Sequence, residues 1–247
     1  MILDTIAVIP ARYSSSRFPG KPLIPLIGKP MIIWVAELTA RVLGAENVFV
    51  ATDDIRIEHV VKDFGFKVAM TSSAALTGTD RVWEVAQQVD SRIYLNIQGD
   101  EPLIDPDDIL KIREVKNLYP EEVINGMCPL KSDELPENKN IPKVVATENN
   151  RLLYMSRLPI PGTKAETANV QFWKQVCIYA FSKSELQAFG SYGRKGKIES
   201  LEDIEILRFL ELNIPVRMVE TCGSSYAIDV PQDVPFVERV LRNSNYE

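Results

Sequence analysis

Short apolar runs alternate along the first half of the chain with longer segments in which apolar residues recur at helical spacing. The short runs predict strands and the longer segments predict helices. The predicted strands are Thr5–Pro10, Asn47–Ala51, Lys67–Met70 and Arg92–Ile97. The predicted helices are Lys29–Leu43, Ile55–Phe64, Thr79–Val89 and Asp105–Leu118. This order indicates the α/β class, with a mostly parallel sheet, helices on both faces and ligands at the carboxyl ends of the strands.

The pattern changes after Asn125, where proline and polar residues separate short strand-like runs. These runs are Ile124–Leu130, Lys143–Thr147, Leu152–Met155 and Val176–Phe181. They predict a small antiparallel insertion, over residues 124–181, within a single domain of residues 1–247. The remaining segments predict a helix over Glu202–Leu212, a strand over Val216–Glu220 and a helix over Gln232–Arg242.

The loop after the first predicted strand is basic, with the sequence IPARYSSSRFPGK from Ile9 to Lys21. Between Thr5 and Ala36 the chain has no acidic residue and four basic ones, which are Arg12, Arg17, Lys21 and Lys29. The whole chain has a net charge of −6. Arginine can clamp phosphate oxygens through two N–H groups, and lysine adds a point charge. The loop therefore predicts a polyphosphate site, although its spacing matches neither a dinucleotide fingerprint nor a Walker motif.

Two further motifs place carboxylates near strand ends. NIQGDEP follows the strand Arg92–Ile97 and contains Asp100, which is placed to hold a divalent cation beside phosphates. SYAIDVPQD contains Asp229, which could share that cation. Alternatively, Asp229 or Asp233 caps the helix that follows, and spacing alone does not separate these interpretations.

Hydroxyl groups also gather at strand ends in the first half, in VATDD, TSSAALTG and GTDR. Thr52, Thr71, Ser72 and Gly78 could contact a base edge or a ribose, and Arg81 could reach a phosphate. The alternative is that these residues serve as ordinary helix caps.

Composition narrows the chemistry further. The chain has one histidine, His59, on a predicted helix, and three cysteines without a CxxC pair. This argues against a histidine base, a thiolate zinc site and a disulfide framework. The acidic balance argues against a broad nucleic-acid-binding face. The sequence shows neither a signal-peptide pattern nor an apolar run of the ~20 residues that span a membrane. We therefore expect a cytoplasmic protein that binds neither nucleic acid nor membranes.

Together the motifs resemble those of the 3-deoxy-manno-octulosonate (Kdo) cytidylyltransferases. The matching segments occur in family order: IPARYSSSRFPGKPL, GKPMI, VATDD, TSSAALTGTDR, NIQGDEP, YMSRLPIP and AIDVPQD. The resemblance implies a Rossmann-like nucleotidyltransferase fold, with the antiparallel insertion helping a homodimer to form. It also implies that CTP and an acidic 2-keto sugar become a CMP-sugar and pyrophosphate, with Mg²⁺ as cofactor.

The resemblance also implies roles for individual residues. The nucleotide would contact Pro10, Ala11, Arg12, Ser15, Arg17, Lys21, Thr52, Thr71, Ser72, Gly78 and Arg81. The sugar would contact Gln98, Arg157, Gln175, Tyr179 and Glu205. Asp100 and Asp229 would bind Mg²⁺ and, with Lys21, form the catalytic group.

Two segments depart from the family pattern on the sugar-facing side. Lys174–Tyr179 reads KQVCIY where the family usually has RHLGIY, and Glu205–Arg208 reads EILR where it has EQLR. Glutamine can replace some hydrogen bonds of histidine but cannot become cationic. The acceptor therefore stays open between Kdo, an amino derivative of it and another small acidic molecule. A nucleotidyltransferase with a different nucleotide or acceptor and a non-catalytic nucleotide sensor are the alternative functions.

Overall fold

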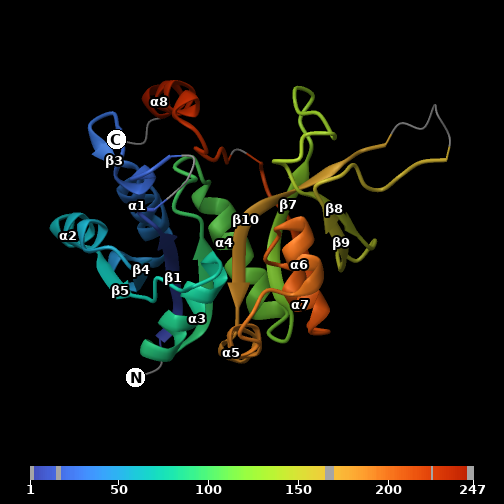
Figure 1. Ribbon diagram of the computed structural model, residues 1–247, viewed down its shortest axis with the longest axis horizontal. Coiled ribbons are helices and arrows are strands. Elements are labelled where there is room, and N and C mark those ends of the chain that lie inside the picture. The colour runs from blue at the N-terminus through green and yellow to red at the C-terminus, as the bar shows by residue number, and fades with distance from the viewer. Residues whose placement is uncertain (1–2, 15–17, 165–169, 224, 244–247) are drawn as a thin grey trace.

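The computed structural model describes residues 3–14, 18–164, 170–223 and 225–243 (Figure 1). Within these residues, one sheet of nine strands runs through the molecule, with β11-β7-β10-β6-β1-β4-β5 as its main path. The parallel part consists of β1 (Leu3–Ala11), β4 (Val48–Thr52), β5 (Lys67–Met70) and β6 (Ser91–Ile97). These strands match the predicted ones, and the predicted mostly parallel arrangement of the first half is confirmed.

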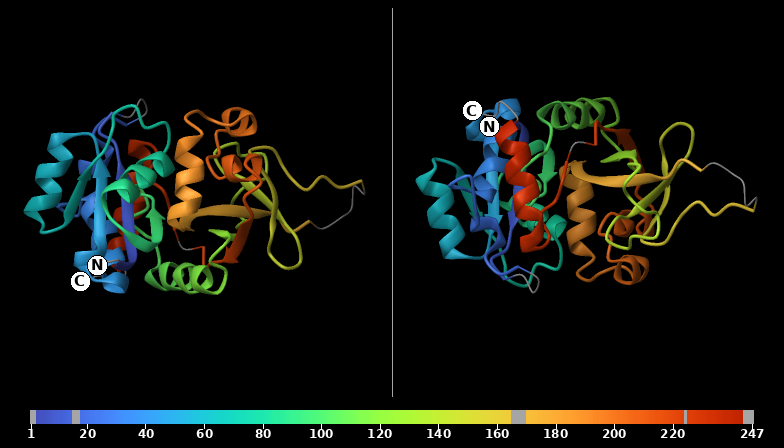
Figure 2. Two further views of the ribbon diagram at one scale, coloured as in Figure 1. Left: turned by 90° about the horizontal axis from the view of Figure 1, so that it is seen from below. Right: turned by 90° about the horizontal axis from the view of Figure 1, so that it is seen from above.

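Helices cover both faces of this sheet, as the two views of Figure 2 show. One face packs against α1 (Met31–Leu43), α2 (Ile55–Asp63) and α4 (Pro106–Leu118). The other face packs against α3 (Gly78–Gln88), α5 (Lys183–Ser191) and α7 (Leu207–Glu211). Because both faces are covered, consecutive strand residues such as Ile6, Ala7, Val8 and Ile9 are all fully buried, which explains the unbroken apolar runs.

The segment of the predicted insertion contributes two strands to the main sheet itself. β10 (Trp173–Phe181) lies antiparallel between β6 and β7 (Val123–Pro129). β11 (Val216–Glu220) then adds parallel to β7. The hairpin of β8 (Lys143–Ala146) and β9 (Leu152–Ser156) joins the outer end of β10 and extends away from the parallel half (Figure 1).

The predicted helix over Glu202–Leu212 is confirmed only in its second half, where α7 lies, and is wrong between Asp203 and Ile206. The structure has α6 (Lys197–Glu202) and α7, separated by a turn. Asp203 adopts a left-handed conformation with φ 50°, which ends α6. The turn brings Asp203, Ile204 and Glu205 to the surface of a large cavity described below.

Several short elements complete the fold. The hairpin of β2 (Pro25–Leu26) and β3 (Lys29–Pro30) precedes α1, which therefore begins at Met31 rather than Lys29. Within the described ranges there are three single turns of 3₁₀ helix: η1 (Lys21–Leu23), η2 (Ala45–Asn47) and η3 (Pro231–Asp233). The last helix, α8 (Val234–Asn243), packs against the β2–β3 region through Val237 and Leu241. Among the described residues, no helix has the length and apolar character to cross a membrane.

Candidate active site

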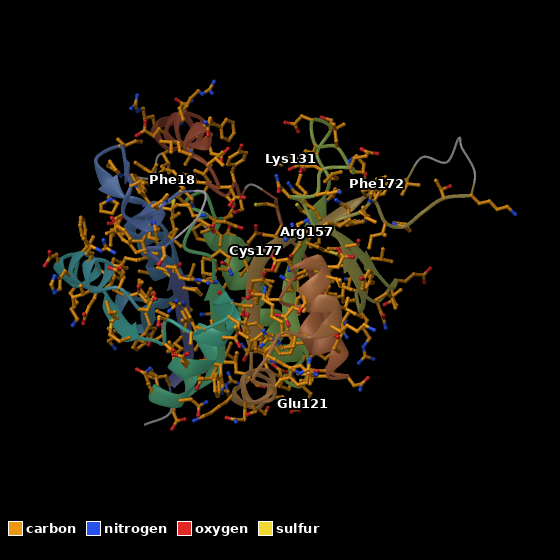
Figure 3. The ribbon with its side chains drawn as sticks, in the orientation of Figure 1. Phe18, Glu121, Lys131, Arg157, Phe172 and Cys177 are labelled. Carbon is orange, nitrogen blue, oxygen red and sulfur yellow. The ribbon has the colours of Figure 1, made fainter. Side chains whose placement is uncertain are left out.

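Two neighbouring cavities open where β1 and β6 end. The smaller cavity, of about 350 Å³, is lined by Pro10, Ala11, Arg12, Lys21, Gly78, Gln98 and Asp100 among others. The larger cavity, of about 550 Å³, shares Arg12, Gly78, Gln98 and Asp100 with the smaller one. Figure 3 marks two further residues of the larger cavity, Arg157 and Cys177, near the middle of the molecule. The shared residues make the two cavities halves of one site.

Lys21 joins the basic loop to both predicted metal ligands. Gly20, in a left-handed conformation with φ 72°, precedes it and starts η1. The Lys21 Nζ atom lies 2.6 Å from Asp100 Oδ2 and 3.7 Å from Asp229 Oδ1. The backbone N–H of Ile228 also donates to the carbonyl oxygen of Asp100, at 2.9 Å. Three distant segments of the sequence therefore meet at one ammonium group.

The carboxylate of Asp233, not that of Asp229, stabilises the start of η3. It accepts hydrogen bonds from the backbone N–H groups of Asp229 and Val230, at 2.8 Å and 3.0 Å. The Asp229 side chain, 39% exposed, instead lines the larger cavity beside Lys21. This favours the interpretation of Asp229 as a site residue over that of a helix cap.

The donor set suits a hard divalent cation. Two carboxylates, Asp100 and Asp229, approach one positive charge, and oxygen ligands are those that Mg²⁺ prefers. In the described ranges, no group of three or more histidine, cysteine or acidic side chains could hold a metal ion. A cation here would therefore take its remaining ligands from phosphate oxygens and water, which is how Mg²⁺ usually binds beside nucleotides.

All of the predicted sugar-binding residues line the larger cavity: Gln98, Arg157, Gln175, Tyr179 and Glu205. They come from different elements. Gln175 and Tyr179 flank a bulge of β10, where the amide of buried Asn125 donates to the carbonyl oxygens of Val176 and Ile178. Gln175 Nε2 in turn donates to Asn125 Oδ1 at 3.0 Å and to Tyr179 Oη at 3.3 Å. The bulge thus fixes the uncharged amide of Gln175 at the cavity wall.

Glu205, in the turn between α6 and α7, contacts the N-terminus of α3. Its Oε2 accepts from the backbone N–H of Thr79 at 3.1 Å. Burial raises the pKa of Glu205, against the opposing effect of this hydrogen bond. The carboxyl group of Glu205 is therefore more readily protonated than that of an exposed glutamate. It could donate a hydrogen bond to a sugar hydroxyl when protonated, or accept one from it when ionised.

The remaining predicted nucleotide residues lie apart from both cavities or outside the described residues. Arg81 is fully buried and donates to Thr71 Oγ1 at 2.6 Å and to Asp53 Oδ1 at 3.1 Å. The hydroxyls of Thr52 and Ser72 accept from nearby backbone N–H groups, as in ordinary caps and turns. Their contact with a nucleotide stays a prediction. Ser15 and Arg17 lie outside the described residues.

Four acidic or basic side chains of the larger cavity were not predicted: Glu101, Lys195, Glu199 and Asp203. Glu101 belongs to NIQGDEP, so its motif could have indicated it. The hydroxyl of Ser225 donates to its carboxylate, and burial raises the pKa of Glu101 to about 7.

The raised pKa of Glu101 predicts that the folded protein becomes less stable as pH rises. The unfolded state releases this proton near pH 4.5, whereas the folded state keeps it to about pH 7. Glu101→Gln removes the titration. We expect the variant to exceed the wild type in free energy of unfolding by about 1–3 kcal/mol at pH 8 and by far less at pH 4.

Urea unfolding at both pH values, without added divalent ions, measures this difference. Glu121→Gln, at an exposed position, is the matched control and should show no such pH dependence. If the free energy of unfolding of Glu101→Gln depends on pH as that of the wild type does, the raised pKa of Glu101 is contradicted.

Comparison with known proteins agrees with this geometry. The model of the family described as cytidylyltransferase matches residues 6–217. The chain is 38% identical over 245 residues to an 8-amino-3,8-dideoxy-manno-octulosonate cytidylyltransferase of Shewanella baltica (strain OS185), covering 97% of this chain and 99% of the relative. It is 40% identical over 249 residues to a 3-deoxy-manno-octulosonate cytidylyltransferase of Syntrophotalea carbinolica, with the same coverage.

A solved structure, CMP:2-keto-3-deoxy-manno-octonic acid synthetase complexed with CTP, superposes with a TM-score of 0.90. It is 36% identical and covers 97% of this chain and 99% of its own. The predicted Rossmann-like nucleotidyltransferase fold is thereby confirmed. By sequence and by fold, then, this chain is a nucleotidyltransferase that belongs to the cytidylyltransferase family, in its 3-deoxy-manno-octulosonate branch.

Proposed function

We propose that the protein transfers CMP from CTP to the anomeric hydroxyl of an acidic 2-keto sugar of the Kdo type and releases pyrophosphate. One observation carries this proposal: the predicted acceptor residues line one cavity, and the basic loop lines its neighbour. Arg12, Gln98 and Asp100 line both, so the reacting phosphate and hydroxyl would meet there.

The residues at this boundary can perform the transfer by positioning and charge neutralisation. Lys21 has three donor hydrogens within the smaller cavity and can contact phosphate oxygens as well as Asp100. Arg12, which lines both cavities, can clamp a phosphate with two N–H groups. Gln98 can orient the acceptor hydroxyl. The reaction needs no protein nucleophile, because the sugar hydroxyl displaces pyrophosphate directly.

We infer that the cofactor is Mg²⁺, held by Asp100 and Asp229. When bound, it supplies Lewis-acid stabilisation of charge on the phosphoryl oxygens.

We also infer a cytoplasmic homodimer. The exposed leucines of the β7–β10 segment, Leu135, Leu153 and Leu158, support an interaction surface there, because apolar side chains gain from burial against a second copy.

Pyrophosphate release tests the proposed function. The purified protein with MgCl₂ is given CTP, ATP, GTP or UTP together with Kdo, its 8-amino derivative or other keto acids. We expect release with CTP and an eight-carbon 2-keto sugar acid, and at least about 100-fold less with the other nucleotides. The preferred sugar of the panel identifies the acceptor. The absence of release with CTP and every keto sugar would overturn the proposal.

A further inference from the structure

The larger cavity must bind a negatively charged acceptor although many carboxylates line it. Its acidic lining residues are Asp100, Glu101, Glu199, Asp203, Glu205 and Asp229. Among the described residues, the cationic side chains that line it are Arg12, Arg157 and Lys195. Which of these three meets the acceptor carboxylate follows from what each already contacts.

Arg12 and Arg157 each have another role besides lining the larger cavity. Arg12 also lines the smaller cavity, on the side of the predicted phosphates. The guanidinium of Arg157 donates from each of its nitrogens to a backbone carbonyl oxygen, those of Glu202, Lys139 and Asp203. Arg157 thus stabilises the loops around the cavity, and those carbonyl groups set the direction of its remaining N–H groups.

Lys195 differs from both. It lies in the loop between α5 and α6, and its side chain is 32% exposed. Its Nζ atom donates to Asp203 Oδ1 at 2.7 Å. An ammonium group has three donor hydrogens, so this contact leaves donors for a ligand.

Asp203 contacts both Arg157 and Lys195. Its backbone carbonyl accepts from Arg157, and its carboxylate accepts from Lys195. The hydrogen bond from Lys195, with the charges of Arg157 and Arg12, lowers the pKa of Asp203, so this carboxylate stays ionised and holds the ammonium in place. The left-handed turn at Asp203 is what brings these groups to the cavity.

β10 supplies no positive charge from Gln175, the position at which the resembled motif has histidine. Its amide is already bonded to Asn125 and Tyr179. A positive charge that replaces it must come from another element, and Lys195 of the α5–α6 loop lines the same cavity.

We propose that Lys195 binds the carboxylate of the acceptor sugar and that Asp203 positions Lys195 for this contact. This inference rests on the proposed function, because it assumes an acidic sugar in the larger cavity. It makes Lys195 a specificity-determining residue for acidic over neutral acceptors.

The test compares an acidic sugar with its C1 carboxamide. For the wild type and Lys195→Gln, kcat/KM is measured with the acid that the pyrophosphate assay identifies, and the carboxamide is measured as a competitive inhibitor. We expect Lys195→Gln to raise KM for the acid by about 10- to 100-fold and to leave KM for CTP within about twofold. The inhibition constant of the carboxamide should change much less than KM for the acid, because the amide has no charge to lose.

Two further variants separate this role from a structural one. Lys195→Arg keeps the positive charge and should restore most of the affinity for the acid. Lys197→Gln, at an exposed position at the start of α6, is the matched control and should behave as the wild type. If Lys195→Gln raises KM for the acid and the inhibition constant of the carboxamide by the same factor, or changes neither, the inference is overturned. A wild type that turns over no keto sugar acid would overturn the proposed function instead.

Discussion

Asp100→Asn is expected to lower kcat by about 100- to 1000-fold or more while the protein keeps its fold. The substitution preserves shape but removes the charge at the boundary between the two cavities, 2.6 Å from the Lys21 ammonium. Pyrophosphate release at increasing MgCl₂ concentration measures the effect. The concentration that gives half-maximal activity should also rise, because an amide oxygen is a weaker ligand for Mg²⁺ than a carboxylate.

Asp229→Asn should show the same two changes, since its carboxylate approaches the same ammonium group. Asp107→Asn is the control, because Asp107 is exposed in the first turn of α4 and lines neither cavity. Circular dichroism establishes that each variant is folded. Near-normal kcat in Asp100→Asn or Asp229→Asn would remove that residue from the predicted metal site.

Arg208→Met is expected to lower the free energy of unfolding by about 3–5 kcal/mol. The Arg208 side chain is fully buried and donates to Glu199 through Nε and Nη2, at 2.7 Å each, and to Asp80 through Nη1, at 2.8 Å. Methionine fills much of the volume but leaves two buried carboxylates without their cation. Uncompensated buried charge is what makes this loss large.

Urea unfolding at pH 7 measures the change. Arg92→Met is the matched control, because it removes an arginine whose ion pair with Asp4 is exposed, and it should cost less than about 1 kcal/mol. If Arg208→Met lowers the free energy of unfolding by less than about 1 kcal/mol, the expectation is contradicted, and Glu199 and Asp80 must tolerate the change by taking up protons or water.

The parallel half of the fold could be predicted because its signals are local. Its strands are buried on both faces and its helices are amphipathic, so periodicity alone located them. The capping box of α5, formed by Ser182 and Glu185, is an equally local signal that was missed. The break between α6 and α7 had no such signal, since Asp203 reaches its left-handed conformation within a helical pattern.

The site was predictable where a motif carries its own chemistry. Arg12 and Asp100 follow the ends of β1 and β6, and Lys21 belongs to the basic loop after β1. Asp229 and Asp233 could not be separated by spacing, because hydrogen bonds to backbone N–H groups decide which of them caps. Lys195 could not be predicted at all, since its place in the cavity depends on the packing of the α5–α6 loop against Asp203.

The hydrogen bond from Ile228 to Asp100 also bears on the order in which the protein becomes active during synthesis. A nascent chain presents the basic loop and Asp100 long before Asp229 leaves the ribosome, because chains emerge from the N-terminus. The contact of α8 with the β2–β3 hairpin, where Glu238 accepts from the Ile27 N–H, then fastens the late segment onto the early one. The proposed catalytic centre is thus completed last, so an unfinished chain would lack the second carboxylate of the proposed metal site.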